Sequence, residues 1–154
     1  MFRKIKYYIE TSVPSMYFAE DAPEKQKITQ EFFNKLNFKQ NEYYISNVMA
    51  LEIDRAAEPL RSNLTKLLNK YEFAVLEENE ETRELSDKYI KEGIIPVRYR
   101  LDALHISIAV VNRMDFLVSW NMEHIVKAST RYRVNNINKL LNYPLVDICT
   151  PEEV

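Results

Sequence analysis

Short apolar runs alternate with helix-like segments along almost the whole chain, and this alternation restricts the fold more than any other feature. The apolar runs are rich in β-branched and aromatic residues and lie at 4–9, 42–46, 72–77, 115–120 and 144–150. Between them, helices are predicted at 23–38, 47–57, 59–71, 79–93, 100–114, 121–129 and 130–143. Strands that alternate with helices predict the α/β class: a three-layer α/β/α sandwich around a mostly parallel sheet of about five strands.

Length and composition predict one soluble domain that spans residues 1–154, with a single core. The only glycine is Gly93, which excludes the glycine-rich phosphate loops of Walker and dinucleotide-binding proteins, and with them ordinary nucleotide enzymes. The formal net charge is −2, so the chain does not have the excess of basic residues that is typical of a nucleic-acid-binding protein. A local basic patch remains compatible with that charge, because net charge averages over all faces.

Cysteine and histidine usage argues against disulfides and zinc. Cys149 is the single cysteine, so no internal disulfide and no CxxC metal site can form. No HExxH or HxH spacing joins His105 and His124, and we expect His105, on the apolar helix 100–114, to be a hydrogen-bonded structural group. No apolar run approaches the roughly 20 residues of a membrane span, and no signal-peptide block follows the N-terminus. We therefore expect a cytoplasmic protein that has no membrane partner.

Polar residues follow two of the predicted strands. Glu10 comes directly after the first strand and is followed by Thr11 and Ser12, and Asn121 comes directly after the fourth strand. In open parallel sheets, ligands bind outside the carboxyl ends of the strands, where the strand order reverses. A charged residue at the end of an apolar strand is therefore a candidate site residue.

Two further acids lie on predicted helices. Glu52 is flanked by Leu51 and Ile53 on the helix after the second strand, and Asp102 opens the apolar helix 100–114. Carboxylates that cluster in a partly dry site repel one another and resist ionisation. A hard divalent cation such as Mg²⁺, which prefers oxygen ligands, removes that conflict, and such a site suits hydrolysis of phosphate esters.

Each of these polar residues also has a simpler interpretation. Glu10 can be an exposed turn residue, and Glu52 a surface acid on an amphipathic helix. Asp102 suits the first turn of a helix, where an acid favours the dipole, and Asn121 suits an N-cap.

Four segments together resemble the PIN-domain family of metal-dependent nucleases, which includes the VapC-type toxins of toxin–antitoxin pairs. They are YIETSV, LEI, LDALHISIAV and FLVSWNMEHI, which occur in this order over nearly the whole chain. The family pattern is an acid and Thr or Ser after the first strand, a Glu on an early helix, an Asp at the head of a buried helix, and an acid or Asn after the fourth strand. The resemblance implies that Glu10, Glu52 and Asp102 are metal ligands, that Asn121 is the fourth catalytic position, and that Thr11 or Ser12 supports the site.

The resemblance also implies an activity and partners. The activity is cleavage of RNA with Mg²⁺ or Mn²⁺, and the implied partners are an antitoxin whose peptide fills the groove and a second copy of the chain. Two positions depart from the family pattern, because Glu10 stands where Asp is usual and Asn121 where many relatives have Asp. The longer Glu10 side chain must fold back, or the metal must lie farther from the strand. With three acids instead of four, we expect one well-occupied Mg²⁺ site.

Basic residues are expected near the same rim and predict contacts with a phosphate backbone. The candidates for substrate binding are Arg98, Arg100 and Lys127, with Lys91, Arg131 and Arg133 nearby. The alternative is that these are ordinary solvated charges. An alternative function is a catalytically silent PIN-like domain that binds RNA or a protein partner through the same groove. A receiver-like signalling domain ranks below both, because it needs an Asp as phosphate acceptor where this chain has Glu10.

Overall fold

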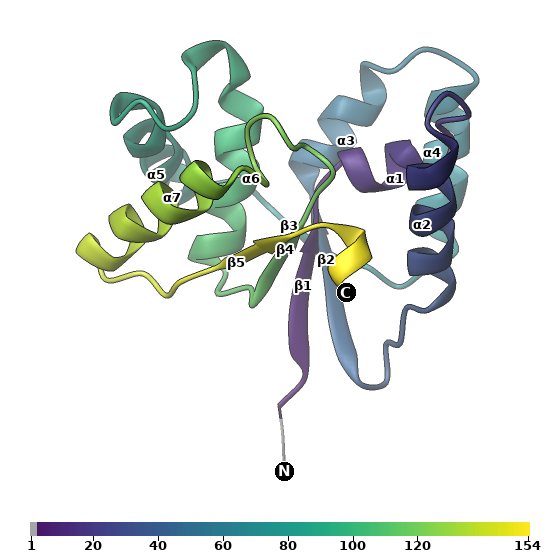
Figure 1. Ribbon diagram of the computed structural model, residues 1–154, viewed down its shortest axis with the longest axis horizontal. Helices are drawn as coiled ribbons and strands as arrows, with labels where there is room; N and C mark the ends of the chain where they lie inside the picture. The colour runs from purple at the N-terminus through teal and green to yellow at the C-terminus, as the bar shows by residue number, and fades with distance from the viewer. Residues whose placement is uncertain (1–2) are drawn as a thin grey trace.

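A single five-stranded sheet forms the centre of the protein (Figure 1). The computed structural model describes residues 3–154. All neighbouring strands are parallel, in the order β3-β2-β1-β4-β5. The strands are β1 (Ile5–Ile9), β2 (Asn41–Ser46), β3 (Ala74–Leu76), β4 (Phe116–Val118) and β5 (Asp147–Cys149). The α/β class, the parallel sheet and the number of strands predicted from the sequence are confirmed.

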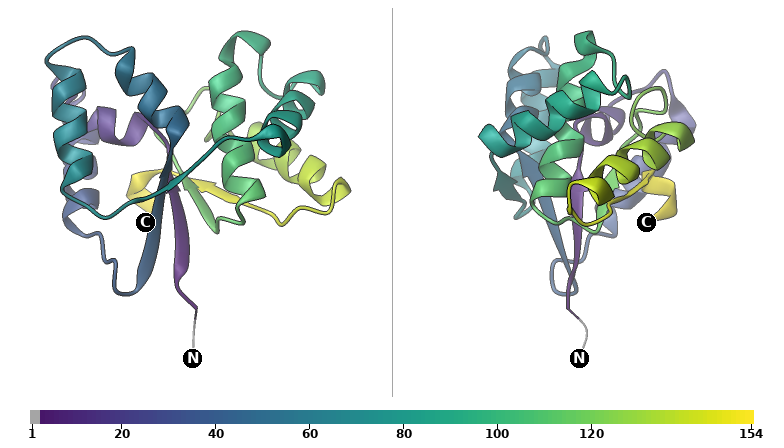
Figure 2. Two further views of the ribbon diagram at one scale, coloured as in Figure 1. Left: turned by 180° about the vertical axis from the view of Figure 1, so that it is seen from behind. Right: turned by 90° about the vertical axis from the view of Figure 1, so that its left-hand side faces the viewer.

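Helices cover both faces of the sheet, which gives the three predicted layers (Figures 1 and 2). One face carries α1 (Ser12–Met16), α2 (Pro23–Asn34) and α4 (Leu60–Asn69). The other carries α5 (Glu80–Lys91), α6 (Arg100–Val111) and α7 (Ala128–Leu140). Helix α3 (Asn47–Asp54) contacts both α4 and α6, and two short 3-10 turns, η1 (Val97–Tyr99) and η2 (Pro151–Glu153), complete the chain.

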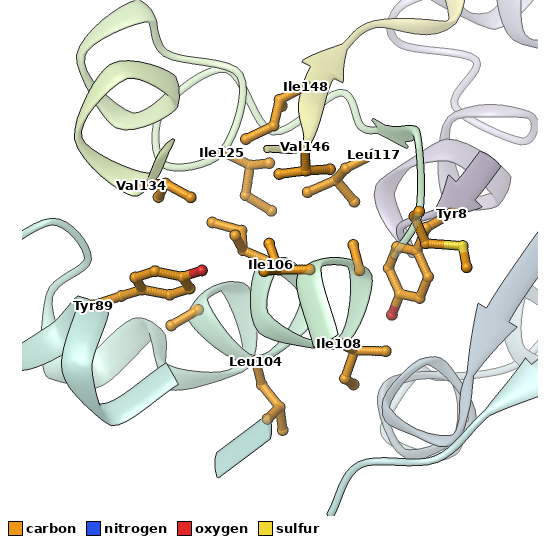
Figure 3. Close-up of a cluster of buried hydrophobic side chains, with 14 of the residues drawn as sticks. Tyr8, Tyr89, Leu104, Ile106, Ile108, Leu117, Ile125, Val134, Val146 and Ile148 are labelled. Atoms are coloured by element: carbon orange, nitrogen blue, oxygen red, sulfur yellow. The ribbon is translucent and has the colours of Figure 1, made fainter. Parts of the chain in front are cut away.

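Side chains alternate across the central strands, so each strand contributes to two cores. Tyr8, Leu117 and Ile148 pack in the cluster under α5, α6 and α7, part of which Figure 3 shows. The next residue along each strand, Ile9, Val118 or Cys149, packs in the cluster under α1, α2 and α4. A parallel sheet that is buried on both faces requires apolar residues at successive positions. This requirement explains why the strands appear in the sequence as continuous apolar runs.

Helix α6 lies in the interior and contributes several of the side chains in Figure 3. All eight residues from 103 to 110 are buried. A helix that is apolar on nearly all sides is stable only where other elements surround it. The predicted buried helix is therefore confirmed, and it carries Asp102 and His105 into the middle of the molecule.

Two short segments differ clearly from the sequence prediction, apart from the two 3-10 turns, which were not predicted either. The helix predicted at 121–129 is wrong: residues 122–125 form turns, in which the backbone carbonyl of Asn121 accepts bonds from the amides of Ile125 and Val126. Helix α1 was not predicted, because five residues that include Pro14 are too short to show a helical period. Within residues 3–154, none of the helices combines the length and the apolar character that crossing a membrane would require.

Asp115 connects the beginnings of β1 and β4. Its carboxylate accepts two bonds from the Arg3 guanidinium, at 2.6 and 2.8 Å, and one from the backbone amide of Lys6 at 2.8 Å. The Arg3 hydrogen bond, with the Lys6 amide and the charge of Arg3, lowers the pKa of Asp115 against the opposing effect of burial. A lowered pKa in the folded state stabilises the protein above the unfolded pKa, and that stability is lost as pH falls through the folded pKa.

We expect Asp115→Asn to lower the free energy of unfolding by about 1 kcal/mol at neutral pH, because it removes the charge from these bonds. The difference from wild type should shrink as pH falls below the unfolded pKa of an aspartate, about 3.9, because the wild-type carboxyl then becomes protonated. Urea denaturation at neutral pH and across the acid range measures this. Asp87→Asn is the control, because the Asp87–Arg100 pair is more than half exposed and should contribute little. Equal effects of the two variants at neutral pH would contradict the role given to Asp115.

Candidate functional site

The candidate site lies where the strand order reverses. From β1 the chain proceeds to β2 on one side of the sheet, and from β4 it proceeds to β5 on the other side. The carboxyl ends of β1 and β4 therefore flank the crevice in which such sheets bind ligands. Glu10 follows β1 and donates its backbone amide to the carbonyl of Val118, the last residue of β4, at 3.0 Å. The first predicted site residue thus occupies the expected position.

The Glu10 carboxylate is folded back against the protein and is only 4% exposed. Its Oε1 accepts bonds from the hydroxyls of Ser12 and Ser119, both at 2.5 Å, and its Oε2 accepts the backbone amide of Ser12 at 3.0 Å. The longer side chain has therefore adopted the first of the two arrangements expected for it. The interpretation of Glu10 as an exposed turn residue is wrong.

Glu52 reaches the same edge from α3. Its Oε1 accepts bonds from the Thr11 hydroxyl at 2.8 Å and from Nε2 of His105 at 2.5 Å. Burial tends to raise the pKa of Glu52, but the hydrogen bond and charge of His105 and the bond from Thr11 outweigh it and lower the pKa. Glu52 is therefore a stable carboxylate and not the free surface acid of the simpler interpretation.

His105 begins a buried hydrogen-bonded chain that runs from Glu52 into the core. Its side chain is fully buried, and its Nδ1 lies 2.6 Å from the Tyr8 hydroxyl, which lies 2.7 Å from the Ser46 hydroxyl. Burial lowers the pKa of His105, but the bond to Glu52 and the nearby carboxylates raise it by more. The sequence correctly predicted a hydrogen-bonded structural group. It did not reveal that the partner is Glu52.

Asp102 and Asn121 complete the cluster. Asp102 lies in the first turn of α6, and its Oδ2 is 3.1 Å from Nδ1 of His124. Burial and the charge of Glu10 raise the pKa of Asp102, against a hydrogen bond from Asn121 and the charges of His124 and His105. The Asn121 side-chain oxygen accepts the backbone amide of His124 at 3.0 Å. Asn121 therefore caps the turn after β4, and the helix that it was expected to N-cap does not form there.

The side-chain oxygens of the three acids and of Asn121 suit a hard cation, both as ligand atoms and in their negative charge. Carboxylate and amide oxygens are what Mg²⁺ prefers, and the effect of Glu10 on Asp102 shows a repulsion that a cation would relieve. Within the described residues, no three His, Cys, Asp or Glu side chains are already arranged to hold one ion. Glu10 is turned toward Ser12 and Ser119, and His105 engages one oxygen of Glu52. A bound ion would therefore require at least one carboxylate to rotate.

Two of the three basic candidates lie at the beginning of α6: Arg98 in η1, directly before it, and Arg100 as its first residue. The Arg98 guanidinium lies 5.0 Å from the ring centroid of Tyr99, and that ring packs on His124 with centroids 3.9 Å apart. Arg100 donates to Asp87 at 2.7 Å, so it is engaged by α5. Arg98 thus lies beside Tyr99, whose ring packs on the histidine that contacts Asp102, while Arg100 is paired on the surface.

The third basic candidate, Lys127, lies directly before α7 and lines a polar cavity together with His124. Because His124 also contacts Asp102, the cavity adjoins the acidic cluster. The sequence did not single out Ser119 or assign a role to His124. Ser119 could be suspected only from its place in FLVSWN after the fourth strand, and neither residue has a spacing signal of its own.

Comparison with known proteins supports the fold alone. No family model matches the chain, and no curated protein matches it. Among solved structures, it is similar to a chain in the crystal structure of VapBC2 from Rickettsia felis bound to a DNA fragment from their promoter. The TM-score is 0.54 at 15% sequence identity, over 95% of this chain and 98% of that chain. This similarity agrees with the PIN-like α/β arrangement that the sequence resemblance implied.

Proposed function

We propose that this chain is a Mg²⁺- or Mn²⁺-dependent endoribonuclease that hydrolyses RNA phosphodiester bonds. The observation that carries the proposal is the placement of four polar residues, from four separate segments, around the edge where the strand order reverses. They are Glu10, Glu52, Asp102 and Asn121. Carboxylates at such an edge suit metal-assisted hydrolysis of a phosphate ester, because the substrate and the developing charge are both anionic.

Glu10, Glu52 and Asp102 are the residues that would hold the metal, and the bound ion would polarise the phosphate and lower the pKa of a water molecule. His105 and Thr11 hold one oxygen of Glu52 and so fix the orientation of its carboxylate. Ser12 and Ser119 hold Glu10 in the same way. These contacts fix the orientation of both carboxylates, so a bound ion would replace at least one of the contacts.

We also propose that the protein is the toxin of a toxin–antitoxin pair, with an antitoxin protein and a second copy of the chain as partners. The support is the structural similarity to the VapBC2 chain, which extends over nearly the full length of both chains. The resemblance of the four segments to VapC-type toxins points in the same direction.

One observation favours the alternative, a silent PIN-like domain that binds RNA or a protein without cleaving it. Within residues 3–154, the acids are engaged by hydroxyls and by His105 and are not arranged around one ion. In this alternative, the hydrogen bonds to Glu10 and Glu52 stabilise the fold and serve no catalytic purpose.

Metal binding separates the two functions. We expect Mg²⁺ at about ten times its Kd to raise the Tm by roughly 3–5 °C, because a ligand that binds only the native state stabilises it. Asp102→Asn should abolish the rise, and differential scanning fluorimetry with and without Mg²⁺ measures it within each variant. Asp54→Asn, which removes an exposed acid from the helix that carries Glu52, should retain the rise. A wild-type protein whose Tm does not respond to Mg²⁺ or Mn²⁺ at any concentration would favour the silent domain.

A further inference from the structure

A polar cavity of about 300 Å³ lies at the N-terminal end of α7. The residues that matter for its chemistry are Glu123, His124, Lys127, Ser129, Thr130 and Arg133. The first two come from the turn after β4, and the others from the start of α7 and the residue before it. A cavity of this volume can accommodate a phosphate group with part of its nucleotide.

The first turn of α7 offers unpaired backbone donors to this cavity. Lys127 occupies the N-cap position, and its side chain makes no capping hydrogen bond. The first amides of a helix have no partner within the helix, and here Ser129 and Thr130 line the cavity. Because α7 has 13 residues, its dipole also places partial positive charge at this end.

Thr130 supplies a second, independent sign of a ligand. It is only 4% exposed, yet its hydroxyl has no hydrogen-bond partner among residues 3–154, whereas buried Thr29 and Thr82 are both paired. In that part of the chain, every fully buried side-chain polar atom has a partner. The Thr130 hydroxyl must therefore reach solvent, and Thr130 lines this cavity.

The charges around the cavity favour an anion. Lys127 and Arg133 contribute two positive charges, and Arg133 is held in place by donating to the backbone carbonyl of Glu92 at 3.1 Å. Glu123 is the acid that lines the cavity, but its side chain is 81% exposed and so is largely screened by water. Cations, helix amides and a hydroxyl together form the donor set that binds phosphate.

We propose that this cavity binds a phosphate group of the RNA strand, next to the phosphate that is cleaved. The proposal rests on the ribonuclease function and names a subsite for it. His124 links the two places, because it lines the cavity and its Nδ1 lies 3.1 Å from Asp102. An RNA strand carries a phosphate at every nucleotide, so a strand whose phosphate reaches Asp102 presents another to the neighbouring cavity. The cavity thereby orients the strand across the acidic cluster.

The test is binding of a short labelled single-stranded RNA, measured by fluorescence anisotropy in EDTA so that neither metal nor cleavage is needed. We expect Lys127→Gln and Arg133→Gln each to weaken binding about five- to tenfold and to reduce the slope of log K against log salt by about 0.7. Thr130→Val should weaken binding roughly threefold. It should leave the Tm unchanged, because the lost hydroxyl has no protein partner.

Lys139→Gln is the matched control, because it removes the same charge from the exposed last turn of the same helix. It should change binding by less than about twofold, as expected of a charge that contacts no phosphate. Binding is measured with two RNAs, one that carries a 5′-phosphate and one that carries a 5′-hydroxyl. If the cavity substitutions weaken binding of the 5′-phosphorylated RNA alone, the cavity binds a terminal phosphate. If they weaken binding of both RNAs equally, it binds an internal phosphate. Either result supports the subsite.

The subsite is overturned if Lys127→Gln, Arg133→Gln and Thr130→Val bind RNA as the Lys139→Gln control does, or if wild type binds no RNA. A separate cleavage assay with Mg²⁺ distinguishes this failure from failure of the proposed function. If wild type cleaves RNA but the cavity variants bind normally, the nuclease proposal stands without the subsite. If the cavity variants lose RNA binding but wild type does not cleave RNA, the phosphate subsite is supported and the proposed ribonuclease activity is rejected.

Discussion

Replacing Glu52 by Gln should reduce Mg²⁺-dependent cleavage of a pooled RNA by on the order of 100-fold or more. The substitution keeps the size of the side chain and an oxygen that can accept the Thr11 bond, but it removes the charge that would hold the metal. The assay incubates pooled RNA with each protein, with and without Mg²⁺, and sequences the products. Sequenced products also identify the cleavage site, which the chain itself does not specify.

The control for this assay is Glu31→Gln, which neutralises an exposed glutamate on α2 and should cleave at the wild-type rate. The Tm of each variant is measured in parallel, so that unfolding is not mistaken for loss of chemistry. Equal cleavage by wild type and Glu52→Gln would point to a contaminating nuclease and would remove the support for the proposed function.

Replacing His105 by Phe should lower the free energy of unfolding by about 2–4 kcal/mol. The imidazole is fully buried between the Glu52 carboxylate and the Tyr8 hydroxyl, and a phenyl ring fills similar space without either bond. Glu52 then remains largely buried without the His105 hydrogen bond, and an unsatisfied bond to a buried carboxylate is more costly than the loss of one ordinary hydrogen bond. Urea denaturation measures the change. Ser107→Ala, at an equally buried position on α6 whose hydroxyl donates to the carbonyl of Leu104, should cost less than about 1 kcal/mol.

A double-mutant cycle shows whether the cost arises from the pair. If His105 and Glu52 stabilise the protein through each other, His105→Phe combined with Glu52→Gln should destabilise it by at least about 1 kcal/mol less than the sum of the single changes. Additivity within about 0.5 kcal/mol would mean that His105 acts through packing and Tyr8 alone.

Local patterns determined the elements and the class of fold. The continuous apolar runs and the helical periods depend on residues that are neighbours in the sequence, and those determine whether a segment is suited to a sheet buried on both faces or to a buried helix. Helix α6 and strand β1 were therefore predictable to within a few residues. The turn at 122–125 was not, because its geometry depends on the carbonyl of Asn121 and on the path from β4 to α7.

The sequence also determined which acids to examine, and only the tertiary structure decided what they contact. Ser12 is two residues from Glu10, but Ser119 is 109 residues away, and it reaches Glu10 because Ile9 pairs with Val118 in the sheet. Glu52 and His105 are 53 residues apart and meet because α3 contacts α6. Strand register and helix packing bring together residues that share no local pattern, and hydrogen-bonded distances follow from that packing. The candidate residues could therefore be identified from the sequence, whereas the fold determines their orientation, their hydrogen-bond partners and the direction of their pKa shifts.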